Sequence, residues 1–376
     1  MISFQLSEEQ EVAREALRGF ARDAMRKLAR ACDEESKIPE EFLAQVSELG
    51  LVSTQIPEAF GGGGEPRSPV THALVLEELA WGDPALALAA LAPAGFAHAI
   101  LDQGSEEQRR RLLPAFCEAG YRAAALAVNE PAAGFDPRRP RTEASRRGDR
   151  YRLSGRKCLV PMADRASHFL VLASCAGSLE AFIVARDAPG LALSPPEKTL
   201  GLRALPTRGL ELDGVEVGLE DRLGGAAGCD VQRLLDRSRA ALAAVMVGLA
   251  RAVLEYAVPY AKERHAFGEA IARKQAIAFR LADMHVETEA SRWLVWKAAS
   301  QLERGVDATR AAHLAQRYAA EQCLWISDQG LQVLGGHGYC RDFVVERLFR
   351  DARALTLHFK TSELLRQDIA KAALGL

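Results

Sequence analysis

The sequence predicts an α+β protein, mainly helical, in which a central β domain separates two helical domains. Apolar residues make up 48% of the 376 residues and aromatic residues only 6%, a composition typical of Ala- and Leu-rich helices. Strand-like runs are confined to the middle of the chain, and long apolar repeats at helical spacing fill its last part. We therefore expect an N-terminal α-helical domain (1–122), a central β domain (123–226) and a C-terminal α-helical bundle (227–376).

The N-terminal domain carries helix-start and helix-stop signals. Ser7 and Ser105 each precede a Gln three positions later, which is the spacing of a capping box. Pro39 is placed to open a helix, and Gly50 to end it. The glycines at 61–64 indicate a loop, but no Gly-Lys-Ser/Thr follows them, so they are not a phosphate-binding loop.

The central domain contains four strand-like runs separated by Gly, Pro and Asp turns. They lie at residues 151–153, 169–173, 181–185 and 210–217. Short runs of this kind favour a small antiparallel barrel or sandwich.

The C-terminal domain contains three segments of long apolar periodicity, at 231–262, 275–304 and 308–334. Lengths above about 20 residues are typical of the helices in a bundle, and we expect a four-helix bundle. Such helices would bury more surface by packing between subunits, so a dimer or tetramer is expected.

Composition argues against several classes of protein and site. The formal charge is −2, which gives no electrostatic case for nucleic acid or an anionic membrane surface. Seven widely spaced Cys without a C-x-x-C argue against disulfides and zinc and fit a reducing cytoplasm, and the His residues show no metal-ligand pattern. The N-terminus does not read as a signal peptide. We expect no membrane span, because no uncharged apolar run is expected to be long enough to cross a bilayer, the segment 240–250 coming closest.

An ordered set of motifs over nearly the whole chain resembles the acyl-CoA dehydrogenase family. The motifs are Leu49-Gly50-Leu51, Ile56-Pro57-Glu58-Ala59-Phe60-Gly61-Gly62, Glu77-Glu78-Leu79-Ala80 with Asp83, Asn129-Glu130-Pro131-Ala132-Ala133-Gly134-Phe135-Asp136, Tyr260 to Gly268, Leu281 to Met284, Gln332 to Tyr339, and Glu346 to Ala352. The resemblance implies the acyl-CoA dehydrogenase fold and FAD-linked α,β-desaturation of an acyl thioester, in which a carboxylate takes the α-proton and flavin N5 takes a hydride. It also implies that FAD lies across a subunit boundary.

The half of the FAD site that the family lends to a neighbouring subunit looks complete. The resemblance places the guanidinium of Arg264 on the pyrophosphate and Phe267 against the cofactor. Gln275 and Gln332 would hydrogen-bond FAD, and Gly335-Gly336 would let the backbone approach it. Taken singly, Arg264 is better explained by a surface salt bridge and the glycines by the end of a helix; the five residues together favour the cofactor.

The half that receives the flavin looks altered. The resemblance assigns Val128, Asn129, Thr361 and Glu363 to the cofactor, with Asn129 standing for the family's Thr and Glu363 also readable as an ordinary helix N-terminal acid. The family's Ser near pyrophosphate and substrate is Phe135, and its Trp-Ile-Thr over the flavin is Leu159-Val160-Pro161. Pro161 has neither a hydroxyl nor a backbone N–H, and the Gly that follows the family's base is Lys360.

The catalytic base is missing at both positions where the family places it. The usual Glu corresponds to Phe359, and the alternative position on the long helix corresponds to Ser238. Asp236 lies two residues away, roughly 200° around the helix, and would face elsewhere. His358 is a weak candidate for a substitute base, since proton abstraction depends on reach before pKa. Arg239 matches a position near base and thioester.

Three hypotheses remain open. The first is a base-lacking subunit that lends ADP-half contacts to a homologous base-bearing partner. The second is a homo-oligomeric FAD-dependent dehydrogenase of acyl-CoA or acyl-carrier-protein thioesters, with a relocated base or altered chemistry. The third is a scaffold that keeps only the fold. The first two imply electron-transfer flavoprotein or a similar acceptor. A strip at Leu86, Leu88, Leu91 and Ala92 could line an acyl pocket or form ordinary core.

Overall fold

The computed structural model describes residues 5–375; the expectation about a signal peptide falls partly on residues 1–4, outside the described part. The N-terminal helices are α1 (Glu8–Phe20), α2 (Arg26–Glu35), α3 (Glu40–Glu48), α4 (Pro69–Gly82), α5 (Pro84–Gln103) and α6 (Glu106–Leu112). Both predicted capping boxes are confirmed, because Ser7 and Ser105 each accept a bond from the third helical N–H while that Gln side chain accepts one from the cap N–H. Pro39 lies at the N-cap of α3, and Gly50 follows its end with φ +63°.

The central domain is one mixed sheet. Its strands are β1 (Ala125–Ala127), β2 (Glu143–Arg147), β3 (Arg150–Pro161), β4 (His168–Cys175), β5 (Ser178–Ala185), β6 (Leu191–Leu193) and β7 (Thr207–Gly218), in the order β1-β4-β2-β3-β7-β6 with β5 also on β4. The expected purely antiparallel pairing was wrong for β4. After the β2–β3 hairpin the chain returns so that β4 runs between β1 and β2, parallel to both, while its pairing with β5 is antiparallel.

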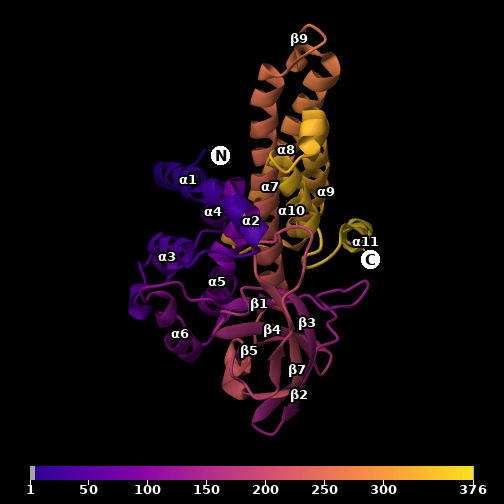
Figure 1. Ribbon diagram of the computed structural model, residues 1–376. Helices are drawn as coiled ribbons and strands as arrows, with labels where there is room; N and C mark the ends of the chain where they lie inside the picture. The colour runs from indigo at the N-terminus through magenta and orange to yellow at the C-terminus, as the bar shows by residue number, and fades with distance from the viewer. Residues whose placement is uncertain (1–4, 376) are drawn as a thin grey trace.

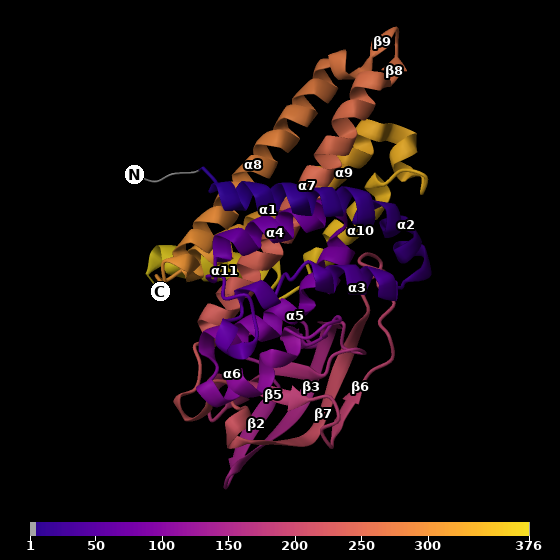
Figure 2. The ribbon, with the colours of Figure 1, turned by 90° about the vertical axis from the view of Figure 1, so that its left-hand side faces the viewer.

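The C-terminal bundle contains α7 (Val231–Glu263), α8 (Gln275–Glu303), α9 (Thr309–Leu334), α10 (Val345–Leu355) and α11 (Ser362–Leu374). A small hairpin, β8 (His265–Ala266) with β9 (Glu269–Ala270), joins α7 to α8. Figures 1 and 2 show that α7 begins beside the sheet and runs to this hairpin, which projects at the opposite end of the molecule. The three long helices predicted from periodicity are confirmed.

Two helices are apolar enough to cross a bilayer by length and composition, α5 and α7, so the expectation that no uncharged run reaches that length was wrong. Helix α5 carries 18 residues without Asp, Glu, Lys or Arg at its start. In both helices 78% of the most apolar window is buried inside the protein. Their apolarity is therefore accounted for by contact with the surrounding elements, as in a helix hydrophobic on all sides at the centre of a fold.

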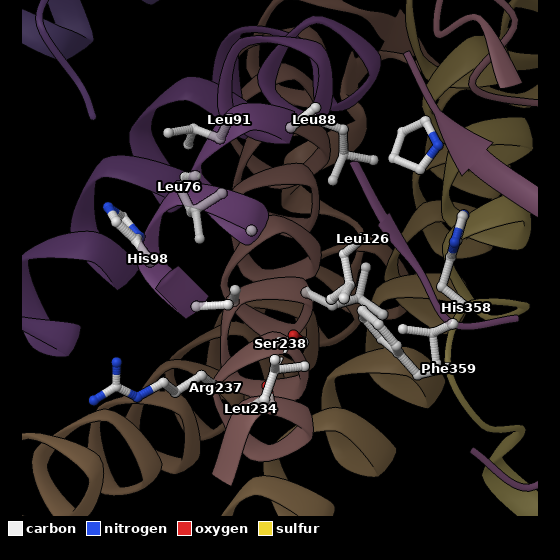
Figure 3. Close-up of a pocket in the computed structure, with 18 of the residues that line it drawn as sticks. Leu76, Leu88, Leu91, His98, Leu126, Leu234, Arg237, Ser238, His358 and Phe359 are labelled. Carbon is white, nitrogen blue, oxygen red and sulfur yellow. Dashed lines mark hydrogen bonds between the residues drawn. The ribbon is translucent and has the colours of Figure 1, made fainter. Parts of the chain in front are cut away.

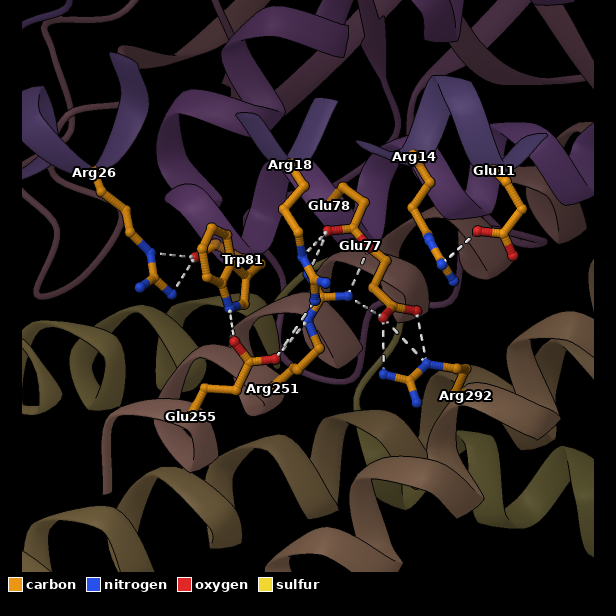
Figure 4. A network of polar contacts seen from close by, with 10 residues as sticks. All are labelled: Glu11, Arg14, Arg18, Arg26, Glu77, Glu78, Trp81, Arg251, Glu255 and Arg292. Atoms are coloured by element: carbon orange, nitrogen blue, oxygen red, sulfur yellow. Dashed lines mark hydrogen bonds and ion pairs between the residues drawn. The ribbon is translucent and has the colours of Figure 1, made fainter. Parts of the chain in front are cut away.

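The N-terminal helices are held on the bundle by a buried ionic network between α4 and α7 (Figure 4). Arg251 Nη1 donates to Glu77 and Glu78 at 2.8 Å, and Arg292 of α8 donates to Glu77. The helices can approach because α7 has Gly248 at the crossing: a Cβ there would stand 2.3 Å from the Glu77 carbonyl oxygen. Helix α5 is thereby positioned against α7 beside the sheet.

Candidate functional site

A cavity of about 190 Å³ lies where α4, α5, α7, the sheet and the loop before α11 meet. Its apolar lining includes Leu76, Leu88, Leu91, Leu126, Leu234 and Val245. The predicted strip on α5 is thus divided, since Leu88, Leu91 and Ala92 line the cavity while Leu86 is fully buried in the core. Figure 3 shows His358 and Phe359 on one side of the cavity, His98 and Arg237 on the other, and Ser238 between them.

The loop that carries Phe359 is held in place from two sides. Asn129 donates from Nδ2 to the Leu357 carbonyl at 3.1 Å and accepts from the Phe359 N–H at 2.9 Å. Gln316 of α9 donates to the carbonyls of His358 and Lys360 at 3.1 and 3.3 Å. These bonds stabilise Phe359 at φ +62°, a left-handed conformation that bulky residues rarely adopt.

No carboxylate stands at either expected base position. Phe359 and Ser238 both line the cavity, and the Ser238 hydroxyl donates to the Leu234 carbonyl at 2.9 Å. His358 also lines it, and burial lowers the pKa of its imidazole to about 4. It is therefore neutral at physiological pH but a weak proton acceptor. Asp102 is the one carboxylate among the described residues that line the cavity.

The residues expected to receive the flavin have other contacts in the structure. The Asn129 amide bonds the loop as described, and Leu159, at φ +52°, lines the cavity together with Val128 and Pro161. Phe135 packs, half-buried, against an apolar cluster to which α5, β4, β5 and the start of α7 contribute.

Lys360, the residue that follows the missing base, is buried and forms ion pairs. Lys360 Nζ donates to Asp136 at 2.9 Å and to Asp368 at 2.7 Å. Bonds from Arg138 and Lys360 lower the pKa of Asp136 against the cost of its burial. Thr361 is the N-cap residue of α11, and Glu363 is an exposed acid in its first turn, where the backbone N–H lowers its pKa.

Arg239 does not line the cavity. Its side chain is fully buried, and Nη1 donates to Asp236 at 3.0 Å. Asp236 also accepts from Gln232 and Thr309, so it faces away from the cavity, as the helical spacing predicts. The Nε and Nη2 atoms of Arg239 have no hydrogen-bond partner among the described residues.

The residues predicted to contact the ADP half lie together at the other end of the bundle. Arg264 ends α7, Phe267 is 94% exposed in the β8–β9 hairpin, and Gln275 opens α8. Gln332 and Gly335-Gly336 end α9 and are exposed. The Tyr260 hydroxyl bonds His337 Nδ1 at 2.9 Å and the Leu334 carbonyl, which docks this glycine turn beside the end of α7. Within the described chain no side chain pairs with Arg264.

A polar cluster at the far side of the cavity was missed by the sequence reasoning. It consists of Arg67, His72, His98, Asp102 and Arg237. His98 and Asp102 stand four residues apart on the otherwise apolar α5, so they share one face of it. That pair was the signal available in the sequence. No group of His, Cys, Asp and Glu that could hold a metal occurs in the part of the chain that the structure describes.

Comparison with known proteins gives matches along the whole length of the chain. Family models for the acyl-CoA dehydrogenase N-terminal, middle and C-terminal domains match residues 7–120, 125–215 and 229–374. The probable acyl-CoA dehydrogenase FadE25 of Mycobacterium tuberculosis is 34% identical over 99% of this chain and 97% of its own. The caffeyl-CoA reductase-Etf complex subunit CarC of Acetobacterium woodii is 32% identical over 97% and 98%. Butyryl-CoA dehydrogenase from Megasphaera elsdenii superposes with a TM-score of 0.90 at 28% identity, covering 99% and 100%.

Proposed function

The chain belongs to the acyl-CoA dehydrogenase family, and we propose that it is a base-lacking subunit that lends ADP-half contacts for FAD to a base-bearing homologue. Members of this family are FAD-dependent oxidoreductases. The complex would desaturate an acyl thioester between Cα and Cβ. This chain would supply binding groups, and its partner would supply the proton acceptor.

The observation that carries the proposal is the contrast between the two ends of α7. At the cavity end, Phe359 and Ser238 occupy the base positions, and the amide of Asn129 is engaged by the loop. Pro161 offers no donor there. These residues do not fit a site for desaturation, which needs a base for the α-proton of the thioester and hydrogen-bond donors to the flavin ring. At the hairpin end, the exposed Arg264, Phe267 and glycine turn do fit a phosphate-bearing ligand.

The two ends are also too far apart to serve one cofactor within one chain. Arg264 follows Ser238 by 26 residues along α7. At 1.5 Å per residue that separation is about 39 Å, longer than an extended dinucleotide. Arg264 can therefore contact only a cofactor seated mainly in another subunit. Its lack of a partner among the described side chains is the state expected of a group that awaits such a ligand.

Exposed apolar side chains on α8 support assembly into an oligomer. Phe279, Val286 and Trp293 follow one another at seven-residue intervals and are 60%, 61% and 43% exposed. That spacing places them on one side of the helix. We expect this stripe to lie in a subunit interface of a dimer or tetramer.

The proposal extends to the electron acceptor and the cellular compartment. CarC, a relative by sequence, is named as a subunit of an Etf complex, and we propose electron-transfer flavoprotein or a similar protein as the acceptor for the assembled enzyme. All seven Cys are free, which fits a reducing cytoplasm.

The test is the visible spectrum of the purified protein. Expressed alone, the chain is expected to be colourless, with less than about a tenth of a flavin per subunit. Co-expressed with a base-bearing homologue, it is expected to yield a yellow complex that bleaches on addition of acyl-CoA. A stoichiometric flavin in the lone chain would contradict the proposal.

A homo-oligomeric flavoenzyme with altered chemistry is the second candidate, because the imidazole of His358 lines the cavity in its neutral form. In that case the chain alone binds FAD, and an acyl-CoA or acyl-carrier-protein thioester bleaches it. His358→Ala would then slow bleaching at least about 100-fold, the lower range for a general base. Flavin content, measured by absorbance, would stay unchanged in that variant.

A further inference from the structure

We infer that the cavity of this chain binds an acyl thioester whose acyl chain ends in a carboxylate, held by Arg67 and Arg237. This goes beyond the proposed function, since it concerns a ligand bound by this subunit's own pocket without turnover. Membership of the acyl-CoA dehydrogenase family supports only one part of the inference, namely that the ligand is a thioester. The carboxylate is inferred from the charges at the far side of the cavity.

At the far side of the cavity, two arginine side chains share one carboxylate, that of Asp102. Arg67 of the loop before α4 donates from Nη2 to Asp102 at 3.3 Å and from Nη1 to Gln55 at 2.9 Å. Arg237 of α7 forms a close ion pair with the same Asp102 carboxylate. The group therefore carries one uncompensated positive charge in a mostly apolar setting. Burial accordingly lowers the pKa of Arg67 and of Arg237 to about 10, and both stay charged at neutral pH.

Several donors of this cluster have no partner. The Nε atoms of Arg67 and Arg237 and the Nε2 atom of His98 are inaccessible to water and unbonded within the described chain. The His98 side chain is only 6% exposed. Its ring meets that of His72 at a centroid distance of 5.2 Å, and burial with the charge of Arg67 nearby lowers the pKa of both imidazoles, so both are neutral donors or acceptors. Because these atoms are closed off from the cavity, they do not contact a ligand, but they show that the cluster has more buried donors than acceptors.

The rest of the cavity defines the remainder of the ligand. Leucines of α4, α5 and β1 line the path between the Phe359 loop and the side where Figure 3 shows His98 and Arg237. An acyl chain fits this apolar stretch. A methyl end would leave the extra positive charge without a counter-ion, and an ammonium end would be repelled by it. A single carboxylate supplies the one missing negative charge and bidentate acceptors for a guanidinium.

The experiment compares matched thioesters by isothermal titration calorimetry on the full chain: adipyl-CoA against hexanoyl-CoA, and suberyl-CoA against octanoyl-CoA. Each pair has the same number of carbons and differs at the chain end. We expect the carboxylate-ended member to bind about 10- to 100-fold more tightly, the range for hydrogen bonds to charged groups. Equal binding, tighter binding of the methyl-ended member, or binding of neither would overturn the inference.

Substitutions locate the preference in the cluster. Arg237→Gln and Arg67→Gln are each expected to reduce it to about threefold or less, while Arg237→Lys, which keeps the charge, retains part of it. Arg233→Gln is the matched control on the same helix, because Arg233 donates to the Leu302 carbonyl and does not line the cavity; its preference should be intact. Asp102→Asn removes the internal anion and should enlarge the rise in melting temperature that adipyl-CoA causes. If Arg237→Gln and Arg67→Gln keep the full preference, the cluster is not the site.

These measurements separate the inference from the proposed function. Thioester binding is read without flavin, base or partner. A lone chain that contains flavin would overturn the proposed function and leave the chain-end preference standing. A chain without the preference would leave the co-expression result unaffected.

Discussion

In a complex of this chain with a base-bearing homologue, Arg264→Ala is expected to weaken FAD binding about 100-fold. The guanidinium is exposed at the end of α7 and free of any described partner, so it is available for bidentate bonds to a pyrophosphate. Loss of such charge-assisted bonds costs about 3 kcal/mol, which corresponds to that factor. The measurement is flavin content per complex after dialysis, together with the dissociation constant from fluorescence titration of the apo-complex.

The control for this substitution lies at the same end of the bundle. Arg273 belongs to the exposed turn between β9 and α8, outside the motif that carries Arg264, and Arg273→Ala should leave flavin content unchanged. The Arg264→Ala complex should still assemble, as judged by its elution volume. Unchanged flavin affinity in that variant would favour the scaffold hypothesis, in which this chain contributes nothing to the cofactor.

The elements predicted well from the sequence are those fixed by local signals. The capping boxes at Ser7 and Ser105 need only a residue and its neighbour three positions on, and the periodicity of α7 repeats over 33 residues. Both kinds of signal lie within one segment of the chain, so they can be recognised without knowledge of its tertiary contacts. The motif resemblance adds the order of the domains, because it draws on the whole chain.

The parts that were missed depend on contacts between distant residues. Strand β1 has only three residues, and its parallel pairing with β4 joins segments more than 40 positions apart. No local sequence pattern therefore predicts this pairing. Arg67 and Arg237 meet only because α5 brings Asp102 between them. Helix α5 passes a length and composition test for a membrane span, and only its burial inside the protein, which depends on distant residues, accounts for its apolarity.

For individual site residues, too, the chemistry of a side chain can be predicted from the sequence, but its long-range contacts cannot. The sequence indicates that Phe359 cannot act as a base, since that follows from the side chain itself. It does not indicate that Asn129 and Gln316 hold the loop from opposite sides, because those bonds span 228 and 42 positions. Whether Asn129 could still turn toward a flavin depends on these bonds, which only the structure reveals.

The largest loss of stability is expected from Arg251→Met, about 3–5 kcal/mol in the free energy of unfolding. Arg251 is 8% exposed and bonds two carboxylates that are 5% and 2% exposed, Glu77 and Glu78. Its removal leaves Glu77 with Arg292, but leaves Glu78 only the more distant Arg18, at 3.4 Å. A buried carboxylate without a close cation is unfavourable, so α4 and α7 should separate more easily. Urea denaturation followed by circular dichroism measures the change.

Two matched variants show whether burial of the charge, rather than loss of a contact, is the cause. Arg18 also pairs with Glu78, but its side chain is 44% exposed, and Arg18→Ala is expected to cost at most about 1 kcal/mol because water screens the pair. The double variant Arg251→Met/Glu78→Met also removes the unpaired Glu78 carboxylate, and it should recover at least half of the lost free energy of unfolding. If Arg251→Met costs no more than Arg18→Ala, the network does not hold the N-terminal helices on the bundle. The contact between α4 and α7 must then rest on close packing, such as the approach of Glu77 and Ala80 to Gly248.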